Sequence, residues 1–152
     1  MRIGLGCDHN GYELKEKIKA HLAALDLPCA DFGCYTPEAV DYPDIAFQAA
    51  EEIAAGHLDR AILVCGTGNG MNISANKVPG VRAALCHDPL SAEKARKSND
   101  AQVLTMGAWI IDWAIAQQVL TAWLASEFEG GESLRKVSKV KAREAGYGQR
   151  QP

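Results

Sequence analysis

The feature that most constrains the fold is a regular alternation of short apolar runs with longer amphipathic patterns. Runs of this length are typical of strands, and the patterns between them have the spacing of helices that bury one face. The sequence predicts strands at residues 2–7, 28–33, 60–66, 81–86 and 101–107. It predicts helices at residues 12–25, 44–56, 70–78, 91–98, 112–128 and 133–145.

Alternating strands and helices predict an α/β fold, with a parallel sheet, helices on both faces and right-handed crossovers. The run at 60–66 is apolar throughout, which indicates a strand buried on both faces. A length of 152 residues favours one domain, spanning 1–152, and we expect 146–152 to be a frayed tail.

Charge and hydropathy exclude several classes of protein. A net charge of −3 and a pI near 5.8 argue against a nucleic-acid partner, which requires a basic face. The basic stretch at 135–150 is interpreted as a solvated helix face. No apolar run approaches the roughly 20 residues that cross a bilayer, so no membrane partner is expected. The start "MRIGLGCDHNG" lacks a signal-peptide pattern, and a cytoplasmic location is expected.

The thiols and imidazoles suggest no metal site. The five cysteines include no C-x-x-C pair, and the four histidines are scattered, so neither a disulfide framework nor a zinc site is predicted. A reducing compartment fits this pattern. The residues concerned are Cys7, Cys29, Cys34, Cys65 and Cys86, with His9, His21, His57 and His87.

Ligands of open parallel sheets collect outside the carboxyl ends of the strands. The predicted strands place five segments there: residues 8–10, 34–41, 65–72, 87–88 and 107–109. In the first of them, Asp8 and His9 could both face a ligand, although such a pair is more often a cap or a surface pair.

The segment at 65–72, "CGTGNGMN", has three glycines in five residues. Its spacing is G-x-G-x-G rather than the dinucleotide fingerprint, because position 71 is Met, and no phosphate-binding P-loop motif is present. Nicotinamide and ATP are therefore not expected as cofactors. Gly66, Gly68 and Gly70 allow close approach of a ligand to backbone N–H groups, at a point where a helix begins. The loop could bind a phosphate, a carboxylate or an oxyanion, or it could be a tight turn without a ligand.

Cys65 stands where the strand meets this loop. A thiolate there could act as a nucleophile or as a general base. The alternative is a buried cysteine that serves only in packing, which is the commoner role. No Cys-His-Asn protease signature surrounds it, which weakens the nucleophile interpretation.

Several segments together resemble ribose-5-phosphate isomerase type B, within a family that also includes galactose-6-phosphate isomerase subunits and tetrose-phosphate isomerases. The resemblance covers residues 1 to about 131. It implies a three-layer, Rossmann-like, five-stranded fold, no metal, no organic cofactor, and a homodimer or tetramer with sites at the subunit interface. The segments are "GCDHNGYELK" (6–15), "DYPDIA" (41–46), "CGTGNGMNISANKVPGVRAAL" (65–85), "HDPLSAEKAR" (87–96) and "NDAQVLTMG" (99–107).

The resemblance also implies the reaction, an aldose–ketose isomerisation by proton transfer between C1 and C2 through a cis-enediolate. Cys65 matches the family's base and Thr67 a residue beside it. Asp8 and His9 match residues that contact the sugar or its phosphate, and Asn99 matches a residue that reaches the reacting oxygens from the partner subunit. The anion cradle matches the backbone of Gly66, Gly68, Asn69 and Gly70.

Three departures concern the substrate. Ser98 stands where pentose-phosphate members carry a histidine thought to open the furanose ring, which leaves His87 or His9 as candidates, or a substrate that needs no ring opening. Glu132 and Lys136 stand in place of two phosphate-binding arginines, although Arg135 could substitute after a one-residue shift, with Lys136 as a point charge. Trp109 replaces a third arginine and could stack on an apolar sugar face.

The predicted function is therefore a sugar-phosphate isomerase, by default one that interconverts ribose 5-phosphate and ribulose 5-phosphate. The alternatives are a tetrose 4-phosphate, a hexose 6-phosphate or an unphosphorylated sugar as substrate. A non-catalytic sugar-phosphate-binding subunit is an alternative from another class.

Overall fold

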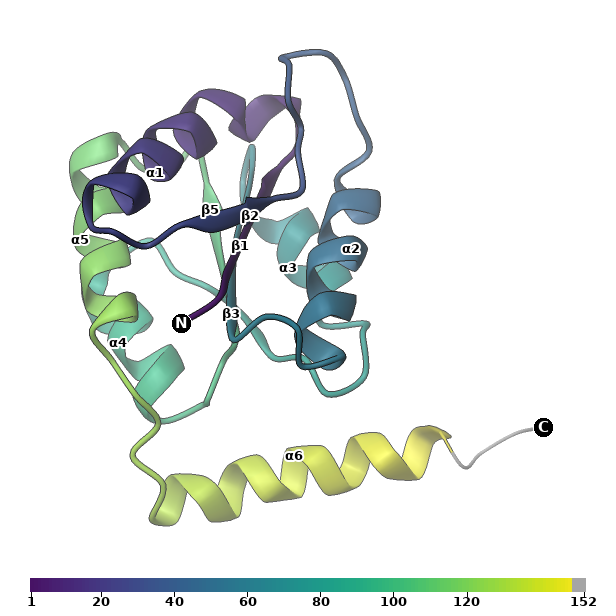
Figure 1. Ribbon diagram of the computed structural model, residues 1–152. Helices are drawn as coiled ribbons and strands as arrows, with labels where there is room; N and C mark the ends of the chain where they lie inside the picture. Colours follow the sequence, from purple (N-terminus) through teal and green to yellow (C-terminus); the bar gives the residue numbers. More distant parts are fainter. Residues whose placement is uncertain (149–152) are drawn as a thin grey trace.

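The structure of the protein is a computed structural model, in which residues 1–148 are described (Figure 1). Five strands and six α-helices alternate along these residues. The strands are β1 (Ile3–Cys7), β2 (Cys29–Asp31), β3 (Arg60–Cys65), β4 (Ala83–Leu85) and β5 (Val103–Gly107). The helices are α1 (Tyr12–Ala24), α2 (Tyr42–Ala54), α3 (Asn69–Ala75), α4 (Pro89–Lys97), α5 (Trp113–Leu124) and α6 (Glu132–Gly148), and a 3-10 turn, η1 (His9–Gly11), precedes α1.

The sheet is parallel throughout, with the strand order β2-β1-β3-β5-β4. Strand β3 lies in the middle and is buried along its whole length, which confirms the prediction from its unbroken apolar run. In the register, Cys7 pairs with Val64 and Cys65 pairs with Gly107. The carboxyl ends of β1, β3 and β5 therefore meet at one edge of the sheet.

Helices cover both faces of the sheet, as predicted. Figure 1 shows α1, α4 and α5 on one face and α2 and α3 on the other. Each face has its own hydrophobic core: Leu5, Ile62 and Trp123 belong to the first, and Leu63 and Met71 to the second. This is the three-layer α/β architecture.

The observed boundaries differ from the predicted ones mainly at helix ends. Helix α2 begins at Tyr42 because Pro43 fits the first turn, where no backbone N–H is needed. Helix α5 ends at Leu124, four residues before the predicted end at 128. Helix α6 continues to Gly148, so 146–148 are helical, whereas 149–152 lie outside the described residues.

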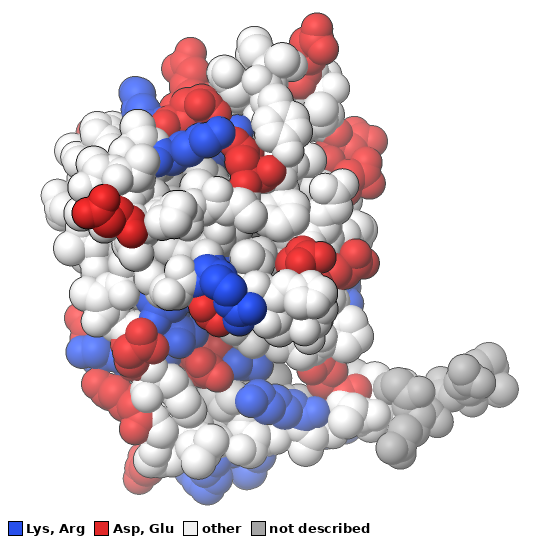
Figure 2. Space-filling view, viewed as in Figure 1, with Lys and Arg blue, Asp and Glu red and all other residues white. Residues whose placement is uncertain are grey.

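Helix α6 extends away from the sheet and runs below the rest of the molecule in the view of Figure 1. Val137 is buried, but Leu134 and Val140 are 52% and 57% exposed. Lys and Arg side chains lie along this helix in Figure 2, in agreement with the predicted solvated basic face. Within residues 1–148, no helix combines the length and apolarity needed to cross a membrane.

Buried Arg60 binds the chain segment that leads to α6. The guanidinium of Arg60, at the start of β3, donates to the carbonyls of Trp123 and Ser126 at 2.9 and 2.8 Å and pairs with Glu127 at 2.7 Å. These bonds satisfy carbonyls left free where α5 ends. They fix the point from which α6 departs.

Candidate active site

The glycine-rich loop begins where β3 ends. Cys65 is the last residue of β3 and is 4% exposed. Its Sγ accepts a hydrogen bond from the backbone N–H of Gly68, over 3.1 Å. The thiol thus lies inside the turn that the glycines form, with its sulfur against a backbone donor.

Gly68 is required by the shape of this turn. Its φ is +81°, in the left-handed region that favours glycine. A Cβ at this position would lie 2.8 Å from the carbonyl carbon of Met106 in β5. The turn directs the chain into α3, whose first residue, Asn69, is exposed. Thr67 is half-buried, and its Oγ1 accepts from the Asn69 N–H over 3.4 Å.

Two aromatic rings lie against the glycines of this loop. A Cβ built on Gly66 would meet the indole of Trp109 at 2.8 Å, and one built on Gly70 would meet the phenol ring of Tyr42 at 2.7 Å. Both rings are partly exposed, Trp109 by 68% and Tyr42 by 41%. Glycine at these two positions therefore leaves room for the two aromatic rings against the loop.

Asp8 and His9 approach the same edge from β1. The backbone N–H of Asp8 donates to the carbonyl of Val64 over 3.1 Å, next to Cys65. Asp8 is 5% exposed, and its Oδ1 accepts from the Gly11 N–H at 3.0 Å. The carboxylate caps the 3-10 turn η1, which is one of the roles considered for it from the sequence. It also borders the site.

His9 keeps one ring nitrogen free for a ligand. Its Nδ1 accepts from the Val40 N–H over 3.4 Å, which leaves Nε2 without a protein partner among the hydrogen bonds of residues 1–148. His9 and Trp109 line one hollow of about 590 Å³, between the first turns of α1 and α5. The hollow is also lined by Asn10, Tyr12, Lys17 and Trp113.

His87 has a structural role at this edge. Its Nε2 accepts the backbone N–H of Gly107 over 2.9 Å, so this nitrogen carries no proton. Burial lowers the pKa of the imidazole, although Asp88 acts in the opposite direction. Of the two histidines considered for ring opening, His87 is therefore held neutral and used as an acceptor, whereas His9 has a free nitrogen.

The remaining predicted site residues lie at the opposite edge of the sheet. Asn99 is exposed and comes four residues before Val103, the first residue of β5, whereas Cys65 pairs with Gly107 at the other end of that strand. A strand of this length spans about 13 Å, at about 3.3 Å per residue. Asn99 therefore cannot reach the Cys65 of its own chain.

Arg135 and Lys136 are exposed on α6. This helix lies at the amino edge of the sheet, whereas the glycine-rich loop lies at the carboxyl edge. Lys136 and Asn99 line a hollow of about 550 Å³, together with Arg82, Ser98 and Val140. One chain thus brings Cys65, Thr67, Asp8 and His9 together at one edge. It brings Asn99 and Lys136 together at the other.

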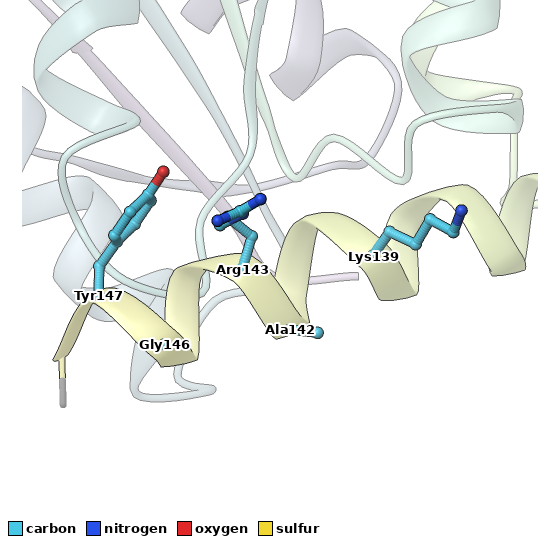
Figure 3. Close-up of a pocket in the computed structure, with 5 residues that line it drawn as sticks. All are labelled: Lys139, Ala142, Arg143, Gly146 and Tyr147. Carbon is cyan, nitrogen blue, oxygen red and sulfur yellow. The ribbon is translucent and has the colours of Figure 1, made fainter.

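Another hollow lies along α6, beyond the one that Lys136 lines (Figure 3). Lys139, Arg143 and Tyr147 line it, and their side chains project from the same side of the helix toward the body. Tyr147 is 60% exposed. The described chain leaves this side of α6 incompletely covered.

Some functional features were not found from the sequence. The predicted helix at 44–56 leaves Tyr42 outside it, and Tyr42 is not among the predicted site residues, although it directly follows the 34–41 segment. Lys15 lies in the predicted amphipathic helix at 12–25, yet its side chain is fully buried. Its ammonium group pairs with Asp31 at 3.1 Å and donates to the carbonyl of Cys34 at 2.8 Å. Lys15 fixes the start of the loop that leads to the site.

No group of three or more His, Cys, Asp or Glu side chains suited to a metal ion occurs within residues 1–148. The groups present at the carboxyl edge are the thiol of Cys65, the imidazole of His9, the carboxylate of Asp8 and backbone amides. This set can move protons and bind oxyanions.

Comparison with known proteins gives consistent results. The sequence model of the family described as Ribose/Galactose Isomerase matches residues 3–140. A relative from Listeria innocua, named ribose-5-P isomerase B, is 50% identical over 90% of this chain and 93% of its own. A relative from Pectobacterium atrosepticum, named D-erythrulose-4-phosphate isomerase, is 46% identical over 92% of this chain and 95% of its own.

The fold agrees with solved structures. The structure of ribose-5-phosphate isomerase B from Clostridium thermocellum matches with a TM-score of 0.95 at 41% identity. The match covers 97% of this chain and 99% of the other. The predicted five-stranded Rossmann-like fold is confirmed.

Proposed function

Because the chain belongs to the ribose/galactose isomerase family, we propose that it interconverts an aldose phosphate and its ketose at the carboxyl edge of the sheet, with Cys65 as the base. The observation that carries the proposal is the position of the thiol. It is buried at the end of the central strand, with a backbone N–H 3.1 Å from its sulfur and a glycine-rich loop around it. A cysteine used only in packing does not need such a loop.

The proposed reaction is a proton transfer between adjacent carbons. The Cys65 thiolate removes the proton from C2 of the aldose, and the electron pair forms the C1–C2 double bond of a cis-enediolate. The thiol then returns a proton to C1, while a proton moves between the two oxygens. Backbone N–H groups of Gly66 and Gly70 are proposed to stabilise the oxyanion, a type of contact worth about 3 kcal/mol per donor in other enzymes.

The default substrate is ribose 5-phosphate, because relatives that carry the name ribose-5-phosphate isomerase B are 41–50% identical to this chain. A four-carbon substrate is the main alternative, since the relative at 46% identity is named for D-erythrulose 4-phosphate. Ser98 supports the alternative, because a serine cannot donate the proton that opens a furanose ring at neutral pH.

We propose that a second copy of the chain completes the site. Asn99 and Lys136 share a hollow at the amino edge of the sheet, whereas Cys65 lies at the carboxyl edge. Helix α6 presents exposed Leu134 and Val140 with little of its own body against them, as expected of a helix that packs on a partner. In a two-fold dimer, the amino edge of one chain would face the carboxyl edge of the other.

Solvent deuterium exchange tests the reaction. The protein in D₂O is incubated with ribulose 5-phosphate and with erythrulose 4-phosphate, and NMR follows deuterium at C1. We expect exchange with at least one of the two, and its loss in Cys65→Ala. Cys29→Ala is the matched control, because Cys29 lies on the edge strand β2 and should retain exchange. Binding of both ketoses without exchange would favour a binding subunit instead.

Complementation tests the shared site. Cys65→Ala and Asn99→Ala are each expected to be nearly inactive alone. Unfolded and refolded together, half of the dimers would be mixed, and one of the two sites in each mixed dimer would be intact. Activity would return to about a quarter of that of the wild-type protein. Recovery would be absent if each site were built from a single chain.

The proposed location is the cytoplasm. All five cysteines are free thiols, including the Cys7 and Cys34 sulfurs, which lie 3.5 Å apart. Free thiols at this distance fit a reducing compartment.

A further inference from the structure

The turn that carries Asn99 has a backbone that needs support. Helix α4 ends at Lys97, and Asn99 lies exposed in the turn that follows it. The next residue, Asp100, has a φ of +49°, in the left-handed region. A residue with a Cβ is disfavoured there and persists only where surrounding contacts hold it. The side-chain amide of Asn99 has no hydrogen-bond partner within residues 1–148, so its position depends on this backbone.

The contacts come first from Arg82, which directly precedes β4 and is 15% exposed in its side chain. Its Nε donates to the carbonyls of Asn99 and Asp100 at 3.1 and 3.0 Å. Its Nη2 donates to the carbonyl of Asp100 and to its carboxylate, both at 2.7 Å. One planar guanidinium thus binds two successive carbonyls and a carboxylate, which restrains the turn more than a single neutral hydrogen bond would.

A second arginine binds the same carboxylate from helix α4. Arg96 is 6% exposed, and its Nη1 donates to Asp100 Oδ1 at 3.2 Å and to the carbonyl of Ala101 at 2.8 Å. The other oxygen, Oδ2, is the one that Arg82 binds. Both oxygens of Asp100 are therefore used within the chain. The carboxylate serves to connect two arginines across the turn and not to contact a substrate.

The guanidinium of Arg82 is not needed to join β4 to β5. The side-chain amide of Gln102 already connects the two segments, because its oxygen accepts from the Arg82 backbone N–H at 2.9 Å and its nitrogen donates to the Gly80 carbonyl at 3.0 Å. The two strands also pair through their backbones. The guanidinium extends beyond these contacts to the turn of Asn99, which indicates that holding this turn is its separate role.

We propose that Arg82, acting through Asp100, is a positioning residue that sets the place of Asn99 in the active site of the partner copy. The inference rests on the proposed isomerase function and on the proposed shared site. Asn99 would have to reach the reacting oxygens beside Cys65 of the other chain. A misplacement of about 1 Å can lower a catalytic rate about a hundredfold, so a residue in a turn of this kind needs a rigid support.

A double-mutant cycle tests whether Arg82 acts through Asn99. Steady-state kinetics are measured for the wild-type protein, Arg82→Ala, Asn99→Ala and the double variant. Arg82→Ala should lower kcat about 10- to 100-fold with KM changed less than about twofold. The double variant should be as active as Asn99→Ala alone, since a residue that acts only through another adds no further loss. The residual exchange of these two variants is followed over longer incubation.

Two further variants control for stability and charge. Arg82→Lys keeps the charge but cannot bind both carbonyls and the carboxylate at once, so its kcat should be intermediate. It keeps the test usable if urea unfolding shows that Arg82→Ala does not fold. Arg2→Ala is the matched control, because Arg2 forms an exposed pair with Asp59 at 2.7 Å, also at the amino edge, and should keep its kcat.

Complementation locates the defect in the shared site. Arg82→Ala refolded with Cys65→Ala should recover about a quarter of the wild-type activity, because each mixed dimer has one site with an intact thiol and an intact Asn99 turn. Arg82→Ala refolded with Asn99→Ala should not recover, because both chains have a defect at the same turn. Failure of the first mixture to recover would contradict the inference, since the defect would then extend to the chain's own thiol.

The kinetic outcomes separate the inference from the proposed function. If the double variant lost the full factor of Arg82→Ala beyond that of Asn99→Ala, the two residues would act independently and the inference would be overturned. A raised KM at unchanged kcat would also overturn it, because Arg82 would then contact the substrate directly. Both results leave the isomerase function in place. Absence of exchange with every sugar phosphate in the wild-type protein would instead overturn the proposed function, and the inference with it.

Discussion

An alanine in place of a turn glycine can destabilise the fold in two ways, through backbone strain at positive φ and through steric overlap of the added Cβ. Comparison of Gly68→Ala with a second glycine substitution separates the two effects. Gly68 and Gly56 both have positive φ, +81° and +74°, so an alanine at either position meets the same backbone strain. They differ in the space around them. A Cβ at Gly68 would lie 2.8 Å from the Met106 carbonyl carbon, whereas one at Gly56 would have no heavy atom within 4 Å. Gly56→Ala is therefore the matched control.

The expected magnitudes follow from this difference. An alanine in the left-handed region lowers the free energy of unfolding by about 1–2 kcal/mol, and this loss is expected in both variants. The reduced entropy of the unfolded chain is also common to both. Overpacking against β5 adds about 1–3 kcal/mol at Gly68 alone, because the contacted atom belongs to a strand backbone that cannot move aside. Gly68→Ala should thus be less stable than Gly56→Ala by about 1–3 kcal/mol.

Urea unfolding at one fixed protein concentration measures the difference, since the stability of the proposed dimer would depend on concentration. Deuterium exchange on the same samples should fall strongly in Gly68→Ala, because displacement of its N–H removes the hydrogen bond to the Cys65 sulfur. Gly56→Ala should keep full activity. Equal stability of the two variants would refute the steric argument, and undiminished exchange in Gly68→Ala would refute the role of the turn in placing the thiol.

Two further predictions concern titration. Burial lowers the pKa of His87 in the folded protein, so the unfolded state takes up a proton at a higher pH than the folded state does. The stability that the neutral imidazole contributes is therefore fully present above about pH 6.5 and should decline as the pH falls below that value. Urea unfolding between pH 7 and 5 should show a smaller loss of stability in His87→Gln than in the wild-type protein. Arg2 lowers the pKa of Asp59 to about 2, so the stability from this exposed pair should be present above about pH 3.8 and lost as the pH falls toward 2. NMR titration should show the Asp59 pKa return toward its usual value in Arg2→Ala, and an unchanged pKa would contradict the pairing.

The elements of the fold were predictable because each depends on a local pattern. The apolar run of β3 and the turn at Gly66–Gly70 are short, contiguous stretches whose periodicity and glycine spacing reflect their own conformation. The order of strands in the sheet depends on crossovers between distant segments, and the sequence pattern did not give it. Boundaries were less accurate at helix ends, where Tyr42 and Leu124 mark limits set by one proline and by the carbonyls that Arg60 binds.

The candidate site also combines features that local sequence patterns predicted with features that depend on contacts between distant segments. Cys65 and its loop could be identified from contiguous residues, and the resemblance to a known family pointed to Asp8, His9 and Asn99. Which of them meet was decided by the sheet. Parallel strands carry Cys65 and Asp8 to one edge and leave Asn99 at the other, and no local pattern contains that separation.

The sequence by itself determined the βα alternation, the glycine-rich turn and the thiol at its start, because each is encoded in neighbouring residues. Only the tertiary structure decided that the indole of Trp109 lies on Gly66, that His87 accepts from Gly107, and that α6 leaves the body. Each of these depends on contacts between residues far apart in the chain. Such contacts are set by how the sheet and its helices pack, and not by the preferences of any one segment.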